Sequence, residues 1–233
     1  MIDWSQVRAL SFDCYGTLID WESGILQALA PWVSRFGSAK VLAGFGAVEP
    51  DLEHAHPIWP YRQVVAEVYR QMARELDVAS DDAAAVRFAD SIANWPPFPD
   101  TIAALRKLKS RFQLFILSNV DEASILGSLK LLAVPFDGVF TAEQIGSYKP
   151  NPRNFDFLLA QMAARGITPQ QIVHVAQSLY HDHGPAQAAG LKTVWIDRTQ
   201  GKPGATRLPH PLPPFDLRFE TLGEFAARAV TTH

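Results

Sequence analysis

The sequence has a single cysteine, Cys14, and almost no net charge, and each shortage excludes a class of protein. A chain with one cysteine forms no intramolecular disulfide and suits a reducing compartment. The 21 Lys and Arg residues against 24 Asp and Glu leave a net charge of -3, without a dense basic cluster. Neither nucleic acid nor an anionic membrane is therefore an expected partner.

Long apolar runs are also missing. No stretch approaches the length of a membrane span, and residues 1–5 show no basic region followed by an apolar stretch. We therefore expect a cytoplasmic monomer or homodimer that acts on a small molecule.

What is present is a hydrophobic content of 48% over 233 residues, which is enough for a full core. Short apolar runs alternate with helical patterns after residue 97, and this alternation predicts a parallel sheet with crossover helices. Five candidate strands for one sheet lie at residues 7–12, 113–117, 138–140, 172–176 and 193–196. A segment rich in Pro and Gly, residues 201–214, is expected to be irregular, and a final strand at 216–219 precedes a helix from Thr221.

Residues 20–95 have a different pattern. Apolar residues recur at helical spacing in 25–36 and 61–76, and no convincing strand lies between them. Three prolines within residues 95–99 end this region. The sequence predicts an α/β fold, with a doubly wound, Rossmann-like parallel sheet core at 1–19 and 97–233. A helical cap domain at 20–96 is inserted into it.

Polar side chains follow four of the predicted strands. Asp13 ends the first, Ser118 and Asn119 end the second, Lys149 comes after the third, and Asp182 follows the fourth. An isolated Asp after a strand is usually a turn residue or helix cap. Open α/β sheets, however, bind ligands beyond the carboxyl ends of their strands, so agreement among four loops favours an active site.

These four motifs, in this order, resemble the haloacid dehalogenase superfamily of hydrolases over essentially the whole chain. Phosphatases of the superfamily carry Asp-x-Asp in the first motif, whereas this chain has Asp13-Cys14-Tyr15-Gly16-Thr17, which resembles the L-2-haloacid dehalogenase branch. Residues 12–22 and 178–183 look closer still to the type II dehalogenase subgroup, which includes L-azetidine-2-carboxylate hydrolase. Residues 94–96 and 146–152 resemble that enzyme in particular.

The absence of a second acid has a chemical consequence. A phosphatase benefits from an acid that protonates the departing alkoxide and from a cation that neutralises the phosphate. A halide leaves without a proton, and a ring ammonium leaves as a neutral amine, so neither needs that carboxyl group. Tyr15 adds bulk that suits the wall of a small apolar pocket.

The resemblance implies a mechanism. Asp13 attacks the carbon next to the substrate carboxylate, and water then hydrolyses the resulting ester. Lys149 would stabilise the Asp13 carboxylate and lower its pKa, and Asp182 would orient Lys149 or help to activate water. Thr17 and Ser118 would donate hydrogen bonds to Asp13 or to the substrate carboxylate. The expected substrate-binding residues, including Asn119 near the leaving group and Glu22 for a substrate ammonium, are Tyr15, Trp21, Glu22, Asn119, Gln177 and Ser178.

Several alternatives remain open at this point. Dehalogenases use a cap arginine to receive the halide, but residues 40–46 contain none, which leaves Arg35 or Arg62 as replacements. The preferred function is therefore hydrolysis at C2 of a small 2-substituted carboxylic acid, named as dehalogenation, with azetidine-2-carboxylate ring opening as its rival. No cofactor or metal is expected. A phosphatase would need magnesium, although Gln177 replaces a usual acid near that metal, and the last alternative is a non-catalytic binding protein.

Overall fold

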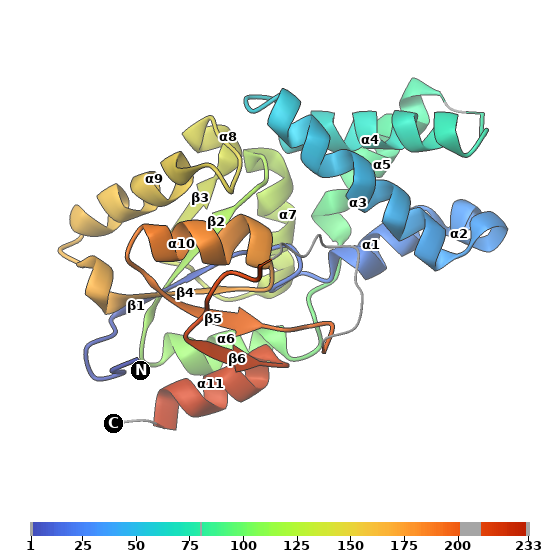
Figure 1. Ribbon diagram of the computed structural model, residues 1–233. Helices are drawn as coiled ribbons and strands as arrows, with labels where there is room; N and C mark the ends of the chain where they lie inside the picture. The colour runs from blue at the N-terminus through green and yellow to red at the C-terminus, as the bar shows by residue number, and fades with distance from the viewer. Residues whose placement is uncertain (1, 80, 201–210, 232–233) are drawn as a thin grey trace.

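A parallel sheet lies at the centre of the computed structural model, which describes residues 2–79, 81–200 and 211–231. Its six described strands have the order β3-β2-β1-β4-β5-β6, and every neighbouring pair is parallel (Figure 1). The strands are β1 (Ala9–Phe12), β2 (Gln113–Ser118), β3 (Gly138–Thr141), β4 (Ile172–Ala176), β5 (Lys192–Ile196) and β6 (Leu217–Phe219). The chain adds β2 and β3 on one side of β1, and then β4, β5 and β6 on the other side. This arrangement confirms the predicted doubly wound α/β fold.

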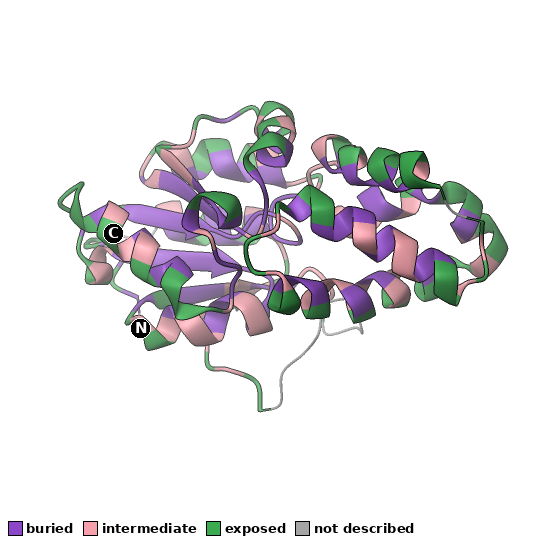
Figure 2. Ribbon diagram, turned by 90° about the horizontal axis from the view of Figure 1, so that it is seen from above, coloured by how far each residue is buried: buried purple, intermediate pink, exposed green. Residues whose placement is uncertain are grey.

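Helices cover both faces of the sheet. Alternate residues of a strand point to opposite faces, and on β2 the side chains of Phe115 and Leu117 belong to one apolar cluster while Leu114 and Ile116 belong to the other. The first cluster packs under α8 (Ala142–Ile145), α9 (Pro152–Ala163) and α10 (Gly184–Ala188). The second packs under α6 (Thr101–Lys109), α7 (Glu122–Leu132) and α11 (Leu222–Thr231). Figure 2 shows the strands buried between these layers, as a parallel sheet requires.

Most of the elements expected after residue 97 are present, with small differences. The strand predicted at 172–176 is β4, and the irregular segment predicted at 201–214 falls largely on residues 201–210, which lie outside the described residues. Asp100 occupies the N-cap position of α6 but its side chain does not cap the helix. The Asp100 carboxylate accepts hydrogen bonds from the backbone N–H of Gly223 and from the Arg198 guanidinium.

Between β1 and α6 the chain forms the helical segment (residues 21–94). It contains α1 (Trp21–Ala28), α2 (Ala30–Phe36), α3 (Ser38–Ala55), α4 (Tyr61–Glu75), α5 (Asp82–Asp90) and the 3-10 helix η1 (Ser91–Asn94). The helical pattern predicted at 25–36 is present but divided between two helices, because the chain breaks at Leu29 and Pro31, in the first turn of α2, has no N–H to continue the earlier hydrogen bonds. The 18-residue helix α3 was not predicted.

Two connections join the helical segment to the sheet, and they run side by side. The Asp20 N–H donates to the Pro96 carbonyl at 2.8 Å, and the Phe98 N–H donates to the Leu18 carbonyl at 3.1 Å. The first connection leaves the carboxyl end of β1 and the second returns to α6, and together they place the helical segment over the carboxyl edge of the sheet (Figure 1).

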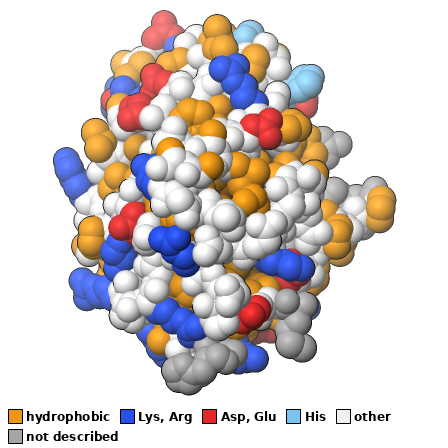
Figure 3. Space-filling model, turned by 90° about the vertical axis from the view of Figure 1, so that its left-hand side faces the viewer, with side chains coloured by type: hydrophobic (Ala, Val, Ile, Leu, Met, Phe, Trp, Pro, Cys, Tyr) orange, Lys and Arg blue, Asp and Glu red, His pale blue; other side chains and the backbone are white. Residues whose placement is uncertain are grey.

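None of the helices in the described part of the chain has the length and apolarity that crossing a bilayer requires. On the face seen in Figure 3, Lys and Arg side chains are spread among apolar and acidic ones and do not gather into one patch.

Candidate active site

The side chain of Asp13 projects from the end of β1 into the junction with the helical segment, and it is almost fully buried. Its Oδ2 accepts a hydrogen bond from the Thr17 hydroxyl at 2.8 Å. The Thr17 Oγ1 in turn accepts from the backbone N–H of Gln177 at 2.8 Å. The first and fourth loops are thus tied together around Asp13, which leaves the carboxylate with a fixed orientation.

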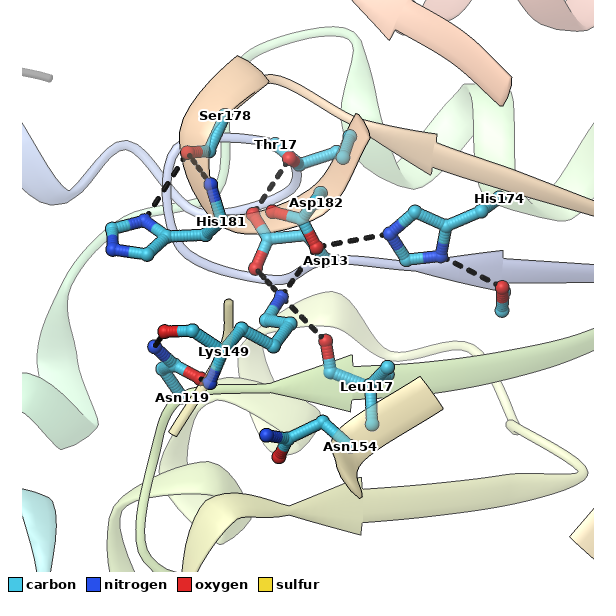
Figure 4. Close-up of polar contacts among 12 residues, drawn as sticks. Asp13, Thr17, Leu117, Asn119, Lys149, Asn154, His174, Ser178, His181 and Asp182 are labelled. Atoms are coloured by element: carbon cyan, nitrogen blue, oxygen red, sulfur yellow. Dashed lines mark hydrogen bonds and ion pairs between the residues drawn. The ribbon is translucent and has the colours of Figure 1, made fainter. Parts of the chain in front are cut away.

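Lys149 lies between two carboxylates (Figure 4). Its Nζ donates to Asp13 Oδ1 at 3.0 Å, to Asp182 Oδ1 at 2.6 Å and to the Leu117 carbonyl at 3.0 Å. The three donor positions of the ammonium are therefore all used. The loops after β1, β3 and β4 meet at one nitrogen atom, as the strand-end pattern predicted for Asp13, Lys149 and Asp182.

Burial and ion pairing oppose each other in this trio. Burial alone would lower the pKa of Lys149, but the carboxylates of Asp13 and Asp182 raise it above its ordinary value. Burial would raise the pKa of Asp182, but the Lys149 ammonium and a hydrogen bond from His174 hold it well below its ordinary value. For Asp13 burial prevails, so its pKa is raised although Lys149 lowers it. The expectation of a lowered Asp13 pKa therefore described one contribution correctly and missed the larger one.

His174 is a member of the site that was not predicted from the sequence. Its Nε2 lies 2.9 Å from Asp182 Oδ1, and its Nδ1 lies 2.8 Å from the Ser11 hydroxyl. The imidazole is fully buried on β4 and packs edge-on against the Phe155 ring. The sequence offered one signal, a polar side chain in the middle of an otherwise apolar buried strand.

Asn119 holds the loop that carries Lys149. Its Oδ1 accepts from the Lys149 backbone N–H at 2.7 Å, and its Nδ2 donates to the Lys149 carbonyl at 3.0 Å. The same Nδ2 also donates to Glu53 Oε2 at 3.0 Å. Asn119 therefore connects the catalytic loops to helix α3 above them.

A cavity opens in front of Asp13, and we call it the Asp13 cavity. It is lined by Asp13, Tyr15, Glu49, Glu53, Tyr61, Ser118, Asn119, Lys149, Ser178, His181 and Asp182. The buried Ser118 hydroxyl has no hydrogen-bond partner among the described residues, so it is placed to bind a ligand. The Ser178 hydroxyl is already paired with His181, accepting from the His181 N–H at 3.1 Å.

The helical segment contributes two carboxyl groups to this cavity, from Glu49 and Glu53 on α3. Neither residue was predicted, because Gly44, Gly46 and Pro50 obscure the helical pattern of α3 in the sequence. Tyr61, from α4, donates its hydroxyl to Glu49 Oε1 at 3.0 Å.

The remaining predicted substrate-binding residues are divided among three cavities. Tyr15 lines the Asp13 cavity, and its hydroxyl lies 2.9 Å from that of Ser128. Trp21 and Gln177 line an adjoining pocket that also contains Phe45 and shares Tyr15 and Glu49 with the Asp13 cavity. Glu22 does not line the Asp13 cavity but faces a separate cleft with Arg198.

Neither of the two candidate replacement arginines lines the Asp13 cavity. Arg62 is exposed and forms an ion pair with Asp90, and Arg35 is exposed and stacks on the Phe36 ring. Neither arginine is therefore placed in this cavity to receive a leaving group. Lys149 is the only Lys or Arg side chain among the described residues that line this cavity.

The two histidines beside Asp182 are engaged in local contacts. Burial lowers the pKa of His181 to about 4 and that of His183 to about 4. His181 pairs with Ser178, and His183 Nε2 lies 3.1 Å from the Ala176 carbonyl. Within the described residues, no group of three or more His, Cys, Asp or Glu side chains is arranged to hold a metal ion.

This chain is similar in sequence to known hydrolases. A family model described as haloacid dehalogenase-like hydrolase matches residues 7–190. The chain is 26% identical over 212 residues to (S)-2-haloacid dehalogenase 4A of Burkholderia cepacia, covering 87% of each chain. It is 25% identical to haloacetate dehalogenase H-2 of Moraxella sp. (strain B), covering 83% of this chain and 87% of that relative.

Solved structures share the fold. One is L-2-haloacid dehalogenase from Xanthobacter autotrophicus with chloropropionic acid covalently bound, which superposes with a TM-score of 0.82. It covers 97% of this chain and all of that chain, at 18% sequence identity.

Proposed function

Because this chain belongs to the haloacid dehalogenase-like hydrolases, we propose that it hydrolyses a small 2-substituted carboxylic acid through an ester between Asp13 and C2 of the substrate. The observation that carries this proposal is the geometry of Asp13, whose two oxygens are fixed by Lys149 and Thr17 while the carboxylate faces a cavity. An oriented, buried carboxylate has lost the hydration that would weaken it as a nucleophile.

In the first step an Asp13 oxygen attacks C2, and the electron pair of the breaking bond goes to the leaving atom. Ser118 is placed to donate its unpaired hydroxyl to the substrate carboxylate. Lys149 supplies the positive charge that opposes the effect of burial on Asp13 and favours its ionised form.

In the second step water attacks the carbonyl carbon of the ester, which releases a 2-hydroxy acid and restores the Asp13 carboxylate. Lys149 and Thr17 already contact the two Asp13 oxygens and stabilise the charge that develops there. Asp182 is a weak base, because its pKa is held well below the ordinary value, so we assign it to positioning Lys149 and not to activating water.

A single-turnover reaction in H₂¹⁸O tests the covalent step. With enzyme in excess, ¹⁸O is expected in Asp13 and ¹⁶O in the new hydroxyl of the product, because the product takes its oxygen from the protein. Label in the first-turnover product without label in Asp13 would overturn the ester mechanism.

The leaving group divides this proposal into two candidates. Dehalogenation, the activity of the relatives named above, is the first candidate. Ring opening of L-azetidine-2-carboxylate is the second, and a specific observation favours it. Among the described residues, the Asp13 cavity contains no arginine for a halide but has two additional carboxyl groups, those of Glu49 and Glu53.

We further propose that residues 20–96 act as a cap over a catalytic core formed by 1–19 and 97–233. The cap would close the cavity and choose the substrate, while the core performs the chemistry. The contacts between Asn119 and Glu53 and between Tyr148 and the Trp59 carbonyl support this arrangement, since each joins the two parts.

Phosphatase activity is the remaining enzymatic alternative. A magnesium ion beside Asp13 would have Tyr15 and Gln177 where a phosphatase has acids, and Lys149 already neutralises Asp13 and Asp182. The described residues therefore fit this metal poorly. Hydrolysis of p-nitrophenyl phosphate that EDTA abolishes would support the phosphatase instead. A non-catalytic binding protein is the outcome if Asp13→Asn leaves every measured activity unchanged.

A further inference from the structure

Glu49 and Glu53 are four residues apart on α3, so their side chains lie on the same face of the helix, and both line the Asp13 cavity. Like charges at this spacing repel each other, and burial makes the repulsion more costly. Such a pair needs compensation from a donor, a proton or a ligand.

The partners of the two carboxyl groups are neutral. Glu53 Oε2 accepts from the Asn119 amide, and Glu49 Oε1 accepts from the Tyr61 hydroxyl. Glu53 is only 4% exposed, and its Oε1 has no partner among the described residues. A buried oxygen that lines a cavity without a partner is a position at which a ligand atom is expected.

The charges of the cavity point to the nature of that atom. Four carboxyl groups line it, those of Asp13, Asp182, Glu49 and Glu53, against the single ammonium of Lys149. The ammonium is already bound to Asp13 and Asp182, so the charge of the Glu pair has no cationic counterpart there. A substrate that brought only a carboxylate and a halide would add negative charge to this surplus.

We propose that Glu53, with Glu49 beside it, determines the substrate class by accepting a hydrogen bond at Oε1 from a positively charged nitrogen on the substrate. This rests on the proposed Asp13 chemistry. The preferred substrates are zwitterions in which the nitrogen is bonded to the carbon that Asp13 attacks. As the Asp13 oxygen bonds to C2, the electron pair of the C2–N bond goes to nitrogen, which leaves as a neutral amine. The proton released when water hydrolyses the ester then protonates that amine.

The surroundings of both carboxyl groups favour their protonated forms when no cation lies beside them. Burial raises the pKa of Glu49 to about 7, and burial together with Glu49 raises that of Glu53 well above its ordinary value. The other titratable groups that line the Asp13 cavity, or the neighbouring cavity that contains Glu53, are Asp13, Tyr15, His54, Tyr61, Tyr148, Lys149, Tyr180, His181 and Asp182. Binding of an ammonium favours the ionised carboxylate, so zwitterion binding is expected to release a proton near pH 7.

Two ring carboxylates of equal size provide a test that does not need turnover. L-proline carries the ring ammonium, while tetrahydrofuran-2-carboxylate has an uncharged oxygen in its place, and neither has a strained ring. Calorimetry at pH 7, in two buffers that differ in ionisation heat, gives both the affinity and the proton balance. We expect L-proline to bind at least about tenfold more tightly than tetrahydrofuran-2-carboxylate, and we expect its binding to release protons.

The variant Glu53→Gln keeps the shape of the side chain and removes its charge. It is expected to abolish the preference for L-proline while leaving the binding of tetrahydrofuran-2-carboxylate unchanged. Asp51→Asn is the matched control, because Asp51 is an exposed acid on the same helix that does not line the cavity. This control should retain the preference of the native protein, and Glu49→Gln provides a second variant if Glu53→Gln does not fold.

The proposal is overturned if the native protein binds L-proline no more tightly than tetrahydrofuran-2-carboxylate, or if neither ligand binds at about 10 mM. It is also overturned if Glu53→Gln weakens the binding of both ligands equally. Failure of the Asp13 ester is a separate result. It would appear in the ¹⁸O experiment, whereas the binding preference is measured without any bond being broken.

Discussion

Lys149 is the residue on which three loops depend, since its buried ammonium joins Asp13 and Asp182. Replacing it by Met retains the apolar stem and leaves two buried carboxylates without a counterion. We expect Lys149→Met to lower kcat/KM by about 10²- to 10³-fold and to destabilise the fold by about 3–5 kcal/mol at pH 7. Steady-state kinetics and urea unfolding measure the two effects. Lys130→Met, at an exposed position of α7, should change neither.

His174 acts one step further from the substrate, as a positioning residue for Asp182. Its pairing with Asp182 helps to lower the pKa of that carboxyl group, so the pairing stabilises the fold above the ordinary pKa of 3.8 and loses its effect as the pH falls through the lowered value. His174→Phe keeps the ring against Phe155 but removes this contact, at a cost of about 1–3 kcal/mol at neutral pH.

Two readouts separate positioning by His174 from simple packing. The stability difference between His174→Phe and the native protein should shrink in acid. His174→Gln can still donate to Asp182, so it should recover part of the activity that His174→Phe loses. A stability loss that stayed the same from pH 7 through the acid range in which native Asp182 takes up its proton, with no recovery by Gln, would mean that the imidazole only fills space.

How far the site could be predicted depends on where each residue's signal lies. Asp13, Ser118, Lys149 and Asp182 each follow a strand, and parallel strands bring such positions together, so a local pattern sufficed. Glu53 and His174 carried no comparable signal. The former depends on how α3 packs over the sheet, and the latter depends on a hydrogen bond between neighbouring strands, so both require the tertiary structure.

At the scale of elements, the strands were predictable and the helical segment was only partly so. Buried parallel strands appear as short continuous apolar runs, which are easily recognised between helical patterns. Helix α3 contains Gly44, Gly46 and Pro50, which have low helix propensity, and tertiary packing of Val41, Phe45 and Leu52 stabilises it instead.

The contact between α1 and the returning chain offers a test at this scale. A Cβ added at Gly24 would lie 2.3 Å from the Trp95 ring, so Gly24→Ala must displace Trp95. Trp95 packs edge-on against Tyr15, with the ring centroids 5.8 Å apart, and Tyr15 lines the Asp13 cavity. We expect a loss of about 1–3 kcal/mol and a raised KM, although alanine is the better helix former.

Thermal unfolding and substrate-saturation kinetics check this expectation. The control is Gly223→Ala in α11, where the added Cβ would meet no atom closer than 3.7 Å. It should be neutral or slightly stabilising. If Gly24→Ala behaved in the same way, the close packing of α1 on Trp95 would have no energetic importance.

For the whole molecule, the pair of Glu49 and Glu53 links the substrate preference to global stability. A carboxyl group whose pKa is raised by folding binds its proton more tightly in the native state, so it stabilises the fold fully below the unfolded pKa and loses that effect as the pH rises through the native value. For Glu49 this window runs from 4.5 to about 7. The contribution of Glu49 to the free energy of unfolding should therefore fall as the pH rises from about 5 to 8, by an amount on the order of 1 kcal/mol.

The double variant Glu49→Gln, Glu53→Gln removes both groups but keeps His181 and His183, whose lowered pKa values make both proteins less stable toward acid. The free energy of unfolding of the native protein minus that of the double variant should therefore fall as the pH rises across this range. Urea unfolding at several pH values measures the difference, and adding L-proline should restore native stability preferentially at the alkaline end, where its ammonium replaces the missing proton. Equal pH dependence in the native protein and the double variant would show that the pair ionises as freely in the folded chain as in the unfolded one. The cavity would then have no unbalanced charge with which to select a cationic substrate.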